Sequence, residues 1–122
     1  MAGNLLFSTT AELIRVPPGS IVYISANGNY SSIKLANGEE FVLTLQLGQM
    51  EKRISGMVAP DDNRFIRIGK SLIVNHDFLI FINPARQKLV LSDCRSFRYE
   101  LSASREALKA LKEFIEQEES EL

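Results

Sequence analysis

The chain has 122 residues, of which 45% are hydrophobic and 24% charged, a composition that supports one folded core and argues against global disorder. Its single cysteine, Cys94, cannot form an intrachain disulfide, and no cluster of Cys and His is present, so we expect a reducing compartment and no metal. The sequence lacks a transmembrane run and a signal peptide, so we expect a soluble, cytoplasmic protein with no membrane partner.

The first half of the chain is typical of short β-strands. Apolar and β-branched runs predict strands at 12–16, 21–25, 30–35 and 40–43. Asn37-Gly38 predicts a tight hairpin, because both residues tolerate the positive φ that such turns need. A short helix is expected from the spacing of four apolar residues, Leu45, Leu47, Met50 and Ile54.

Strands recur in the second half, and a helix ends the chain. The expected strands are 65–68, 72–74, 78–82, 88–91 and 96–101. One face of the expected helix, about 104–117, carries apolar residues at three- and four-residue spacing: Ala107, Leu108, Leu111, Phe114 and Ile115. We therefore expect a mostly β fold with short helices in one domain over 1–122, with a core at about 12–112 and an acidic helical tail at 113–122.

Charge is divided unevenly along the chain, although the net charge is only −1. Residues 1–112 hold all 14 basic residues and 10 acidic ones, a net charge of +4. The last ten residues hold five glutamates and no basic residue. A basic body with an acidic tail is compatible with anion binding on one face, and equally with a solvated surface.

The run from Phe65 to Phe78 predicts a strand, a polar turn and a second strand. Its turn contains Gly69, which permits an unusual backbone conformation, followed by Lys70 and Ser71, and Arg67 precedes it. Donors held on the tip of a β scaffold are a common way to contact phosphates.

Three segments in this order resemble the LytTR family, the DNA-binding domain of LytR/AlgR-type response regulators of bacterial two-component signalling. The segments are Gly-Asn-Tyr-Ser at 28–31, Phe-Ile-Arg-x-x-Lys-Ser-x-x-Val-Asn at 65–75 and Leu-Ser-x-Ser-Arg at 101–105. The resemblance extends from about Ile14 to Leu111. No receiver domain is present in this sequence, so a stand-alone domain or part of a longer protein is expected.

The resemblance implies a fold and a mode of binding. The fold would be an elongated stack of small antiparallel sheets, and the function transcriptional regulation by sequence-specific binding of double-stranded DNA through loops. The base-reading positions would fall on Tyr30, Lys70 and Arg105. Flanking contacts would come from Asn29, Ser31, Arg67, Ser71 and Ser104. Asn75 would fix its own turn. Paired direct repeats and weak self-association on DNA would also be expected, without cofactor, small-molecule substrate or catalysis.

Each of these residues also has a simpler interpretation. Lys70 could be an ordinary exposed turn lysine, Arg105 a first-turn helix arginine, and Tyr30 a cross-strand aromatic residue. His76 and Asp77 are adjacent, so on a strand they would point to opposite faces and could not form a catalytic relay. Solvated strand or loop positions are the simplest expectation for Arg15, Lys34, Arg95 and Arg98. The alternative function is a protein-interaction module that uses the amphipathic carboxy-terminal helix.

Overall fold

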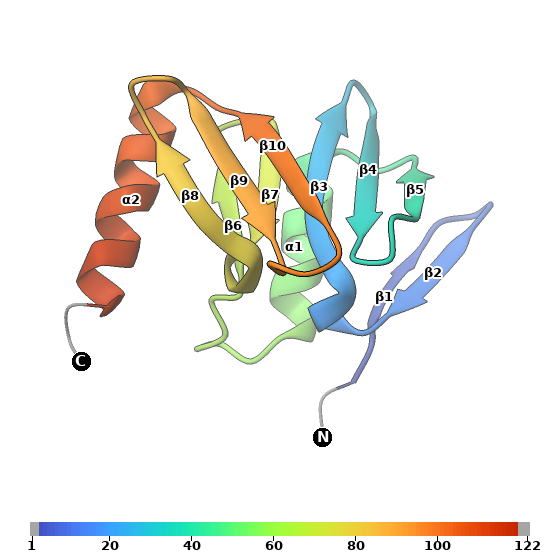
Figure 1. Ribbon diagram of the computed structural model, residues 1–122. Coiled ribbons are helices and arrows are strands. Elements are labelled where there is room, and N and C mark those ends of the chain that lie inside the picture. Colours follow the sequence, from blue (N-terminus) through green and yellow to red (C-terminus); the bar gives the residue numbers. More distant parts are fainter. Residues whose placement is uncertain (1–2, 120–122) are drawn as a thin grey trace. The chain divides into compact units, whose positions relative to one another are not determined.

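The structure, a computed structural model, describes residues 3–119 and contains two compact units that meet in sequence between Asp77 and Phe78 (Figure 1). The single domain expected from the sequence therefore stays a prediction. Ten strands in three antiparallel sheets and two α-helices make up the described residues, which confirms the mostly β fold class with a carboxy-terminal helix. Neither of these two helices is long and apolar enough to cross a membrane.

A five-stranded antiparallel sheet is the centre of the first unit. Its strands lie in the order β5-β4-β3-β7-β6, so consecutive strands are neighbours except where β3 pairs with β7. The bounds are β3 Ile21–Asn27, β4 Tyr30–Leu35, β5 Glu40–Leu43, β6 Phe65–Ile68 and β7 Leu72–Asn75. All five agree with the predicted strands within two residues.

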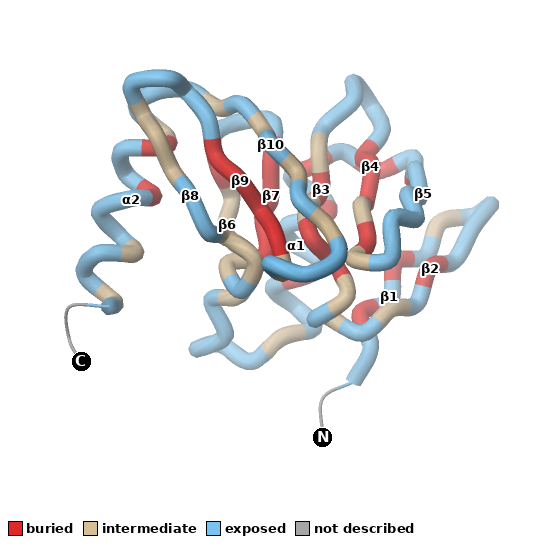
Figure 2. Tube along the Cα trace, viewed as in Figure 1, coloured by how far each residue is buried: buried red, intermediate tan, exposed pale blue. Residues whose placement is uncertain are grey.

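Helix α1 (Leu47–Met57) packs on one face of this sheet and completes the core of the unit. Three of its side chains are buried, namely Leu47, Met50 and Ile54, and they belong to the same hydrophobic core as Ile24, Ile33 and Ile73 of the sheet. Figure 2 shows buried positions along the central strands of this sheet. Burial of an aliphatic side chain of this size contributes about 1.5–3 kcal/mol, so the helix is firmly anchored. The helix starts with a reciprocal capping box between Gln46 and Gln49.

A two-stranded hairpin, β1 (Leu5–Ser8) with β2 (Leu13–Val16), lies beside α1. Strand β1 was not predicted from the sequence. It alternates buried Leu5 and Phe7 with exposed Leu6 and Ser8, but four residues give too short a pattern to separate a strand from a loop. Its pairing with β2 and the burial of Phe7 in the shared core are what make it a strand.

Asn75, at the end of β7, fixes its own turn as the resemblance implied. Its side chain is fully buried, and its Nδ2 donates to the carbonyl oxygen of Ile21 at 2.8 Å. Its Oδ1 accepts the backbone N–H of Asp77 at 2.9 Å. The side chain therefore joins the start of β3 to the 3₁₀ turn His76–Phe78, and it is not available to DNA.

The second unit consists of a three-stranded sheet and helix α2. The strand order is β10-β9-β8, with β8 Leu79–Asn83, β9 Lys88–Ser92 and β10 Arg98–Ser102. Leu89, Val90 and Leu91 of the central strand are buried. Helix α2 spans Arg105–Glu119, contacts β8 and buries Leu108 and Leu111, which confirms the predicted helix. The end of the predicted acidic tail, residues 120–122, lies outside the described residues.

Candidate nucleic-acid interface

Two turns of the first unit lie side by side at one end of the five-stranded sheet. The turn between β3 and β4 is closed by the pair Asn27 and Tyr30, and the turn between β6 and β7 by Ile68 and Leu72. Because β3 and β7 are antiparallel neighbours, the end of β3 lies next to the start of β7. The backbone N–H of Ala26 donates to the carbonyl oxygen of Ser71 at 2.8 Å and joins the two turns directly.

The first turn presents Asn29 and Tyr30 to solvent. Gly28 has a φ of +65°, the left-handed conformation that a side chain disfavours, and this lets the chain reverse within two residues. Tyr30 is 48% exposed. Asn29 is exposed, and its Oδ1 accepts a hydrogen bond from Nε2 of Gln46 at 3.1 Å, so its own amide donors point away from that contact.

The second turn presents Lys70 and Ser71. Gly69 has a φ of +59° and makes this reversal possible. Lys70 and Ser71 are both exposed. Across residues 3–119, the ammonium group of Lys70 forms none of the ion pairs, so its charge is not neutralised by the protein. The structure therefore brings Tyr30 and Lys70 to the same end of one sheet.

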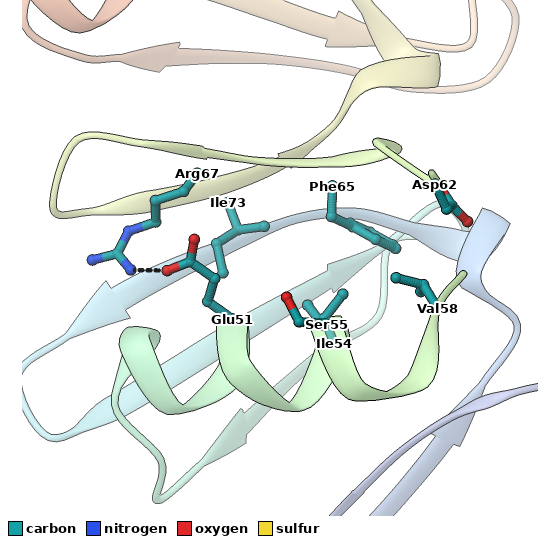
Figure 3. A pocket seen from close by; sticks show the side chains of 8 residues that line it. All are labelled: Glu51, Ile54, Ser55, Val58, Asp62, Phe65, Arg67 and Ile73. Atoms are coloured by element: carbon teal, nitrogen blue, oxygen red, sulfur yellow. Dashed lines mark hydrogen bonds and ion pairs between the residues drawn. The ribbon is translucent and has the colours of Figure 1, made fainter. Parts of the chain in front are cut away.

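Arg67 differs from Lys70, because two of its three guanidinium nitrogens already donate to protein acceptors. Its Nε donates to the carbonyl oxygen of Gly69 at 3.0 Å, and its Nη1 donates to Oε1 of Glu51 at 2.8 Å (Figure 3). Both side chains line a pocket of about 90 Å³ between α1 and the strands β6 and β7. Nothing local in the sequence points to Glu51, because an exposed helix glutamate 16 residues from Arg67 carries no signal of this pairing.

The structure argues against Ser31 as a phosphate contact. Its side chain is fully buried, and its hydroxyl donates to the carbonyl oxygen of Leu45 at 2.6 Å. The group that the resemblance placed at the DNA surface instead ties β4 to the segment before α1. Tyr30 is exposed, but Ser31, Ser32 and Ile33 are all buried, so this part of β4 is covered on both faces.

In the second unit, Ser104 and Arg105 lie at the start of α2. The Ser104 hydroxyl accepts the backbone N–H of Ala107 at 3.1 Å and caps the helix. Arg105 is exposed at the first helical position, where the positive end of the helix dipole disfavours a cation. Within the part of the chain that the structure describes, Arg105 makes no ion pair, so its guanidinium is free to meet an anion.

Lys34 is not the solvated strand charge that the sequence suggested. Its side chain is only 19% exposed and pairs with Glu40 at 3.5 Å. The pKa of the Glu40 carboxyl is lowered, first by the hydrogen bond from the Ser32 hydroxyl and then by the charge of Lys34. The register places Lys34 opposite Glu40 in the β4–β5 ladder, where side chains interact across strands. Arg15, Arg95 and Arg98 are exposed, as expected.

Three other residues with reactive or titratable side chains, His76, Asp77 and Cys94, lie in turns and loops. His76 and Asp77 lie in the 3₁₀ turn, and Asp77 pairs with Arg64 at 3.5 Å. Cys94 is an exposed loop residue with a φ of +62°. Residues 3–119 contain no group of three or more His, Cys, Asp or Glu side chains that could hold a metal ion.

Comparisons with known proteins agree with this fold. The family model described as the LytTr DNA-binding domain matches residues 11–116, which run through both units. A solved structure, the LytTr DNA-binding domain of a putative methyl-accepting/DNA response regulator from Bacillus cereus, is similar with a TM-score of 0.63 and 19% sequence identity. The similarity covers 93% of this chain and 96% of that one. The search of curated proteins found no match. Because the family model matches most of the length of this chain, the chain belongs to the LytTR family of DNA-binding domains.

Proposed function

We propose that this LytTR domain is a sequence-specific transcriptional regulator that recognises double-stranded DNA through exposed turns. The observation that carries the proposal is the pair of adjacent turns that present Tyr30 and Lys70, joined by the bond between Ala26 and Ser71. Two hairpin turns and one helix start are small enough to enter a groove and rigid enough to hold a side chain against a base edge.

The three base-reading candidates would play different parts. The guanidinium of Arg105 can donate two parallel hydrogen bonds to O6 and N7 of guanine. The ammonium of Lys70 can donate to the same acceptors or neutralise a phosphate. The Tyr30 ring and hydroxyl would contact a sugar or the backbone. Flanking contacts are assigned to exposed Asn29 and Ser71 and to Ser104, while buried Ser31 is left out.

We further propose that two copies bind paired direct repeats and associate only weakly. Selection of bound fragments from random duplex DNA, followed by fluorescence anisotropy on the enriched and scrambled duplexes, tests the proposal. An enriched motif that occurs twice in the same orientation, and is bound much more tightly than its scrambled form, is expected. Failure to enrich any motif at low salt would refute sequence-specific binding.

A second candidate function, protein docking by the carboxy-terminal helix, is favoured by a separate observation. A groove of about 230 Å³ lies between β8 and α2, and Ile80 and Phe81, which line it, are about half exposed. The end of α2 carries Glu116 and Glu119 with no basic residue in the last turn. Such a groove suits a segment with apolar and basic side chains.

One pair of variants can distinguish DNA recognition from protein docking. Phe81→Lys should leave DNA binding unchanged but abolish binding of a short basic amphipathic peptide, measured by calorimetry. Lys70→Ala should weaken DNA binding and leave binding of the peptide unchanged. If the unmutated protein binds neither this peptide nor an acidic control, the docking function is wrong.

A further inference from the structure

The β6–β7 turn is supported from two sides. On one side, the carbonyl oxygen of Ser71 accepts the N–H of Ala26. On the other side, the carbonyl oxygen of Gly69 accepts Nε of Arg67 at 3.0 Å. Lys70 is the residue between these two anchored carbonyl groups, so its direction depends on both contacts.

The Arg67 contact is itself held by helix α1. Nη1 of Arg67 donates to Oε1 of Glu51 at 2.8 Å, and the Glu51 side chain extends from α1 toward the β6 strand (Figure 3). Glu51 lies next to buried Met50 and one turn before buried Ile54, both in the core of the unit. The carboxylate is therefore attached to one of the most firmly packed elements of this unit.

We infer that Glu51 is a positioning residue for the DNA-contacting turn and acts on Lys70 through Arg67. This inference rests on the proposed function. A planar guanidinium with donors in fixed directions can bridge two acceptors, and here it connects a helix carboxylate to a turn carbonyl. Arg67 is 28% exposed and its charge is balanced by Glu51, so it holds the turn in place and is not a primary phosphate contact.

The two roles of Glu51, positioning and charge, make different predictions for two variants. Glu51→Ala and Glu51→Gln both remove one negative charge, but Gln keeps an oxygen that can accept the hydrogen bond from Arg67. If Glu51 acts only by repelling phosphates, both variants should bind every duplex more tightly and to the same extent. If Glu51 positions the turn, Glu51→Ala should lose discrimination between the selected and scrambled duplexes, and Glu51→Gln should keep most of it.

The expected loss for Glu51→Ala is about two- to fivefold in affinity for the selected duplex, the range that a partly exposed ion pair supplies. Binding to the scrambled duplex should be unchanged or tighter, because the freed Arg67 can reach a phosphate. The slope of log affinity against log salt should then steepen by about one. Glu116→Ala, which breaks the 2.7 Å pair with Lys112 on α2, is the matched control and should leave discrimination unchanged.

Anisotropy titrations at several salt concentrations measure all four proteins, with circular dichroism and urea unfolding to compare their folds. The inference would be overturned if Glu51→Ala discriminated between the selected and scrambled duplexes as well as the unmutated protein does. It would also be overturned if Glu51→Ala and Glu51→Gln bound every duplex more tightly and to the same extent. If the unmutated protein itself shows no preference for any duplex, the proposed function fails. If the unmutated protein prefers the selected duplex and the variants prefer it equally, the proposed function stands and only the inference about Glu51 fails.

Discussion

The side-chain amide of Asn75 donates to the carbonyl oxygen of Ile21 at 2.8 Å, across 54 residues of sequence and with Asn75 fully buried. A second bond, from the N–H of Asp77 to Oδ1, satisfies the other end of the same amide. One polar side chain thus fixes the entry to β3 and the exit from β7. These two strands are the ones whose opposite ends carry the exposed turns.

Replacement of Asn75 by Ala should destabilise the protein by about 1–3 kcal/mol, because it leaves a buried carbonyl group without a partner. The free energy of unfolding in urea measures the loss. Asn37→Ala is the control, since Asn37 makes a similar bond to the N–H of Glu39 but is exposed to water. If the two substitutions lowered the free energy of unfolding equally, the burial of Asn75 would not be the cause of the loss.

Arg105→Ala should weaken binding to the selected duplex by about 1–3 kcal/mol, the value of a bidentate guanine contact, and relax the preference at one base position. Binding to each single-base variant of the selected duplex measures both effects. A uniform loss on every duplex would instead make Arg105 a phosphate contact.

Lys70→Ala separates base recognition from phosphate binding at the β6–β7 turn. If Lys70 meets only phosphate, its loss should weaken binding similarly on all sequences and reduce the salt slope by about one. If Lys70 contacts a base, Lys70→Ala should reduce the preference for one base at a single position of the selected duplex. Arg15→Ala, an exposed cation on the β1–β2 hairpin, serves as the control and should change neither quantity. Unchanged binding by both Lys70→Ala and Arg105→Ala, in folded proteins, would contradict recognition through these turns.

The acidic end of α2 should oppose DNA binding. Deletion of the residues after Glu116 removes three glutamates, so binding should stay the same or tighten, most clearly at low salt where screening is weak. Anisotropy at two salt concentrations tests this expectation. A complete loss of binding with the fold intact would place the end of the helix in the binding site.

The stability of the protein below about pH 4 should depend on Asp93. Its carboxylate accepts hydrogen bonds from the Ser96 hydroxyl and from the backbone N–H groups of Phe97, Ser96 and Arg95, which hold the pKa of Asp93 well below its usual range. Because the folded-state pKa is depressed, the stabilisation is fully present above the unfolded-state value of about 3.9 and is lost as pH falls below it.

Asp93→Asn should therefore lower the urea midpoint at pH 7, and the difference from the unmutated protein should narrow below about pH 4. Unfolding curves at pH 7, 5 and 3 provide the measurement. Asp61→Asn, an exposed carboxylate of the loop before β6, is the control and should have little effect. A difference that stayed constant from pH 7 to pH 3 would show that the charge of Asp93 is not responsible.

Local patterns in the sequence were enough to predict the family, and nine of the ten strands and both α-helices found in residues 3–119. Short apolar runs, turn residues such as Gly69 and the stripe from Ala107 to Ile115 act within a few residues, so they are visible without tertiary information. The exposure of Lys70 also followed from its position in a turn.

Only the tertiary structure decided which of these residues lie together and which already form hydrogen bonds or ion pairs within the protein. The pairing of β3 with β7 joins residues about 50 positions apart, and no local pattern specifies that register. The same holds for the burial of Ser31, whose hydroxyl donates to the carbonyl oxygen of Leu45, and for the bond between Arg67 and Glu51. These contacts depend on how elements pack, because a side chain's partner across a sheet or a helix is set by the fold and not by its neighbours in sequence.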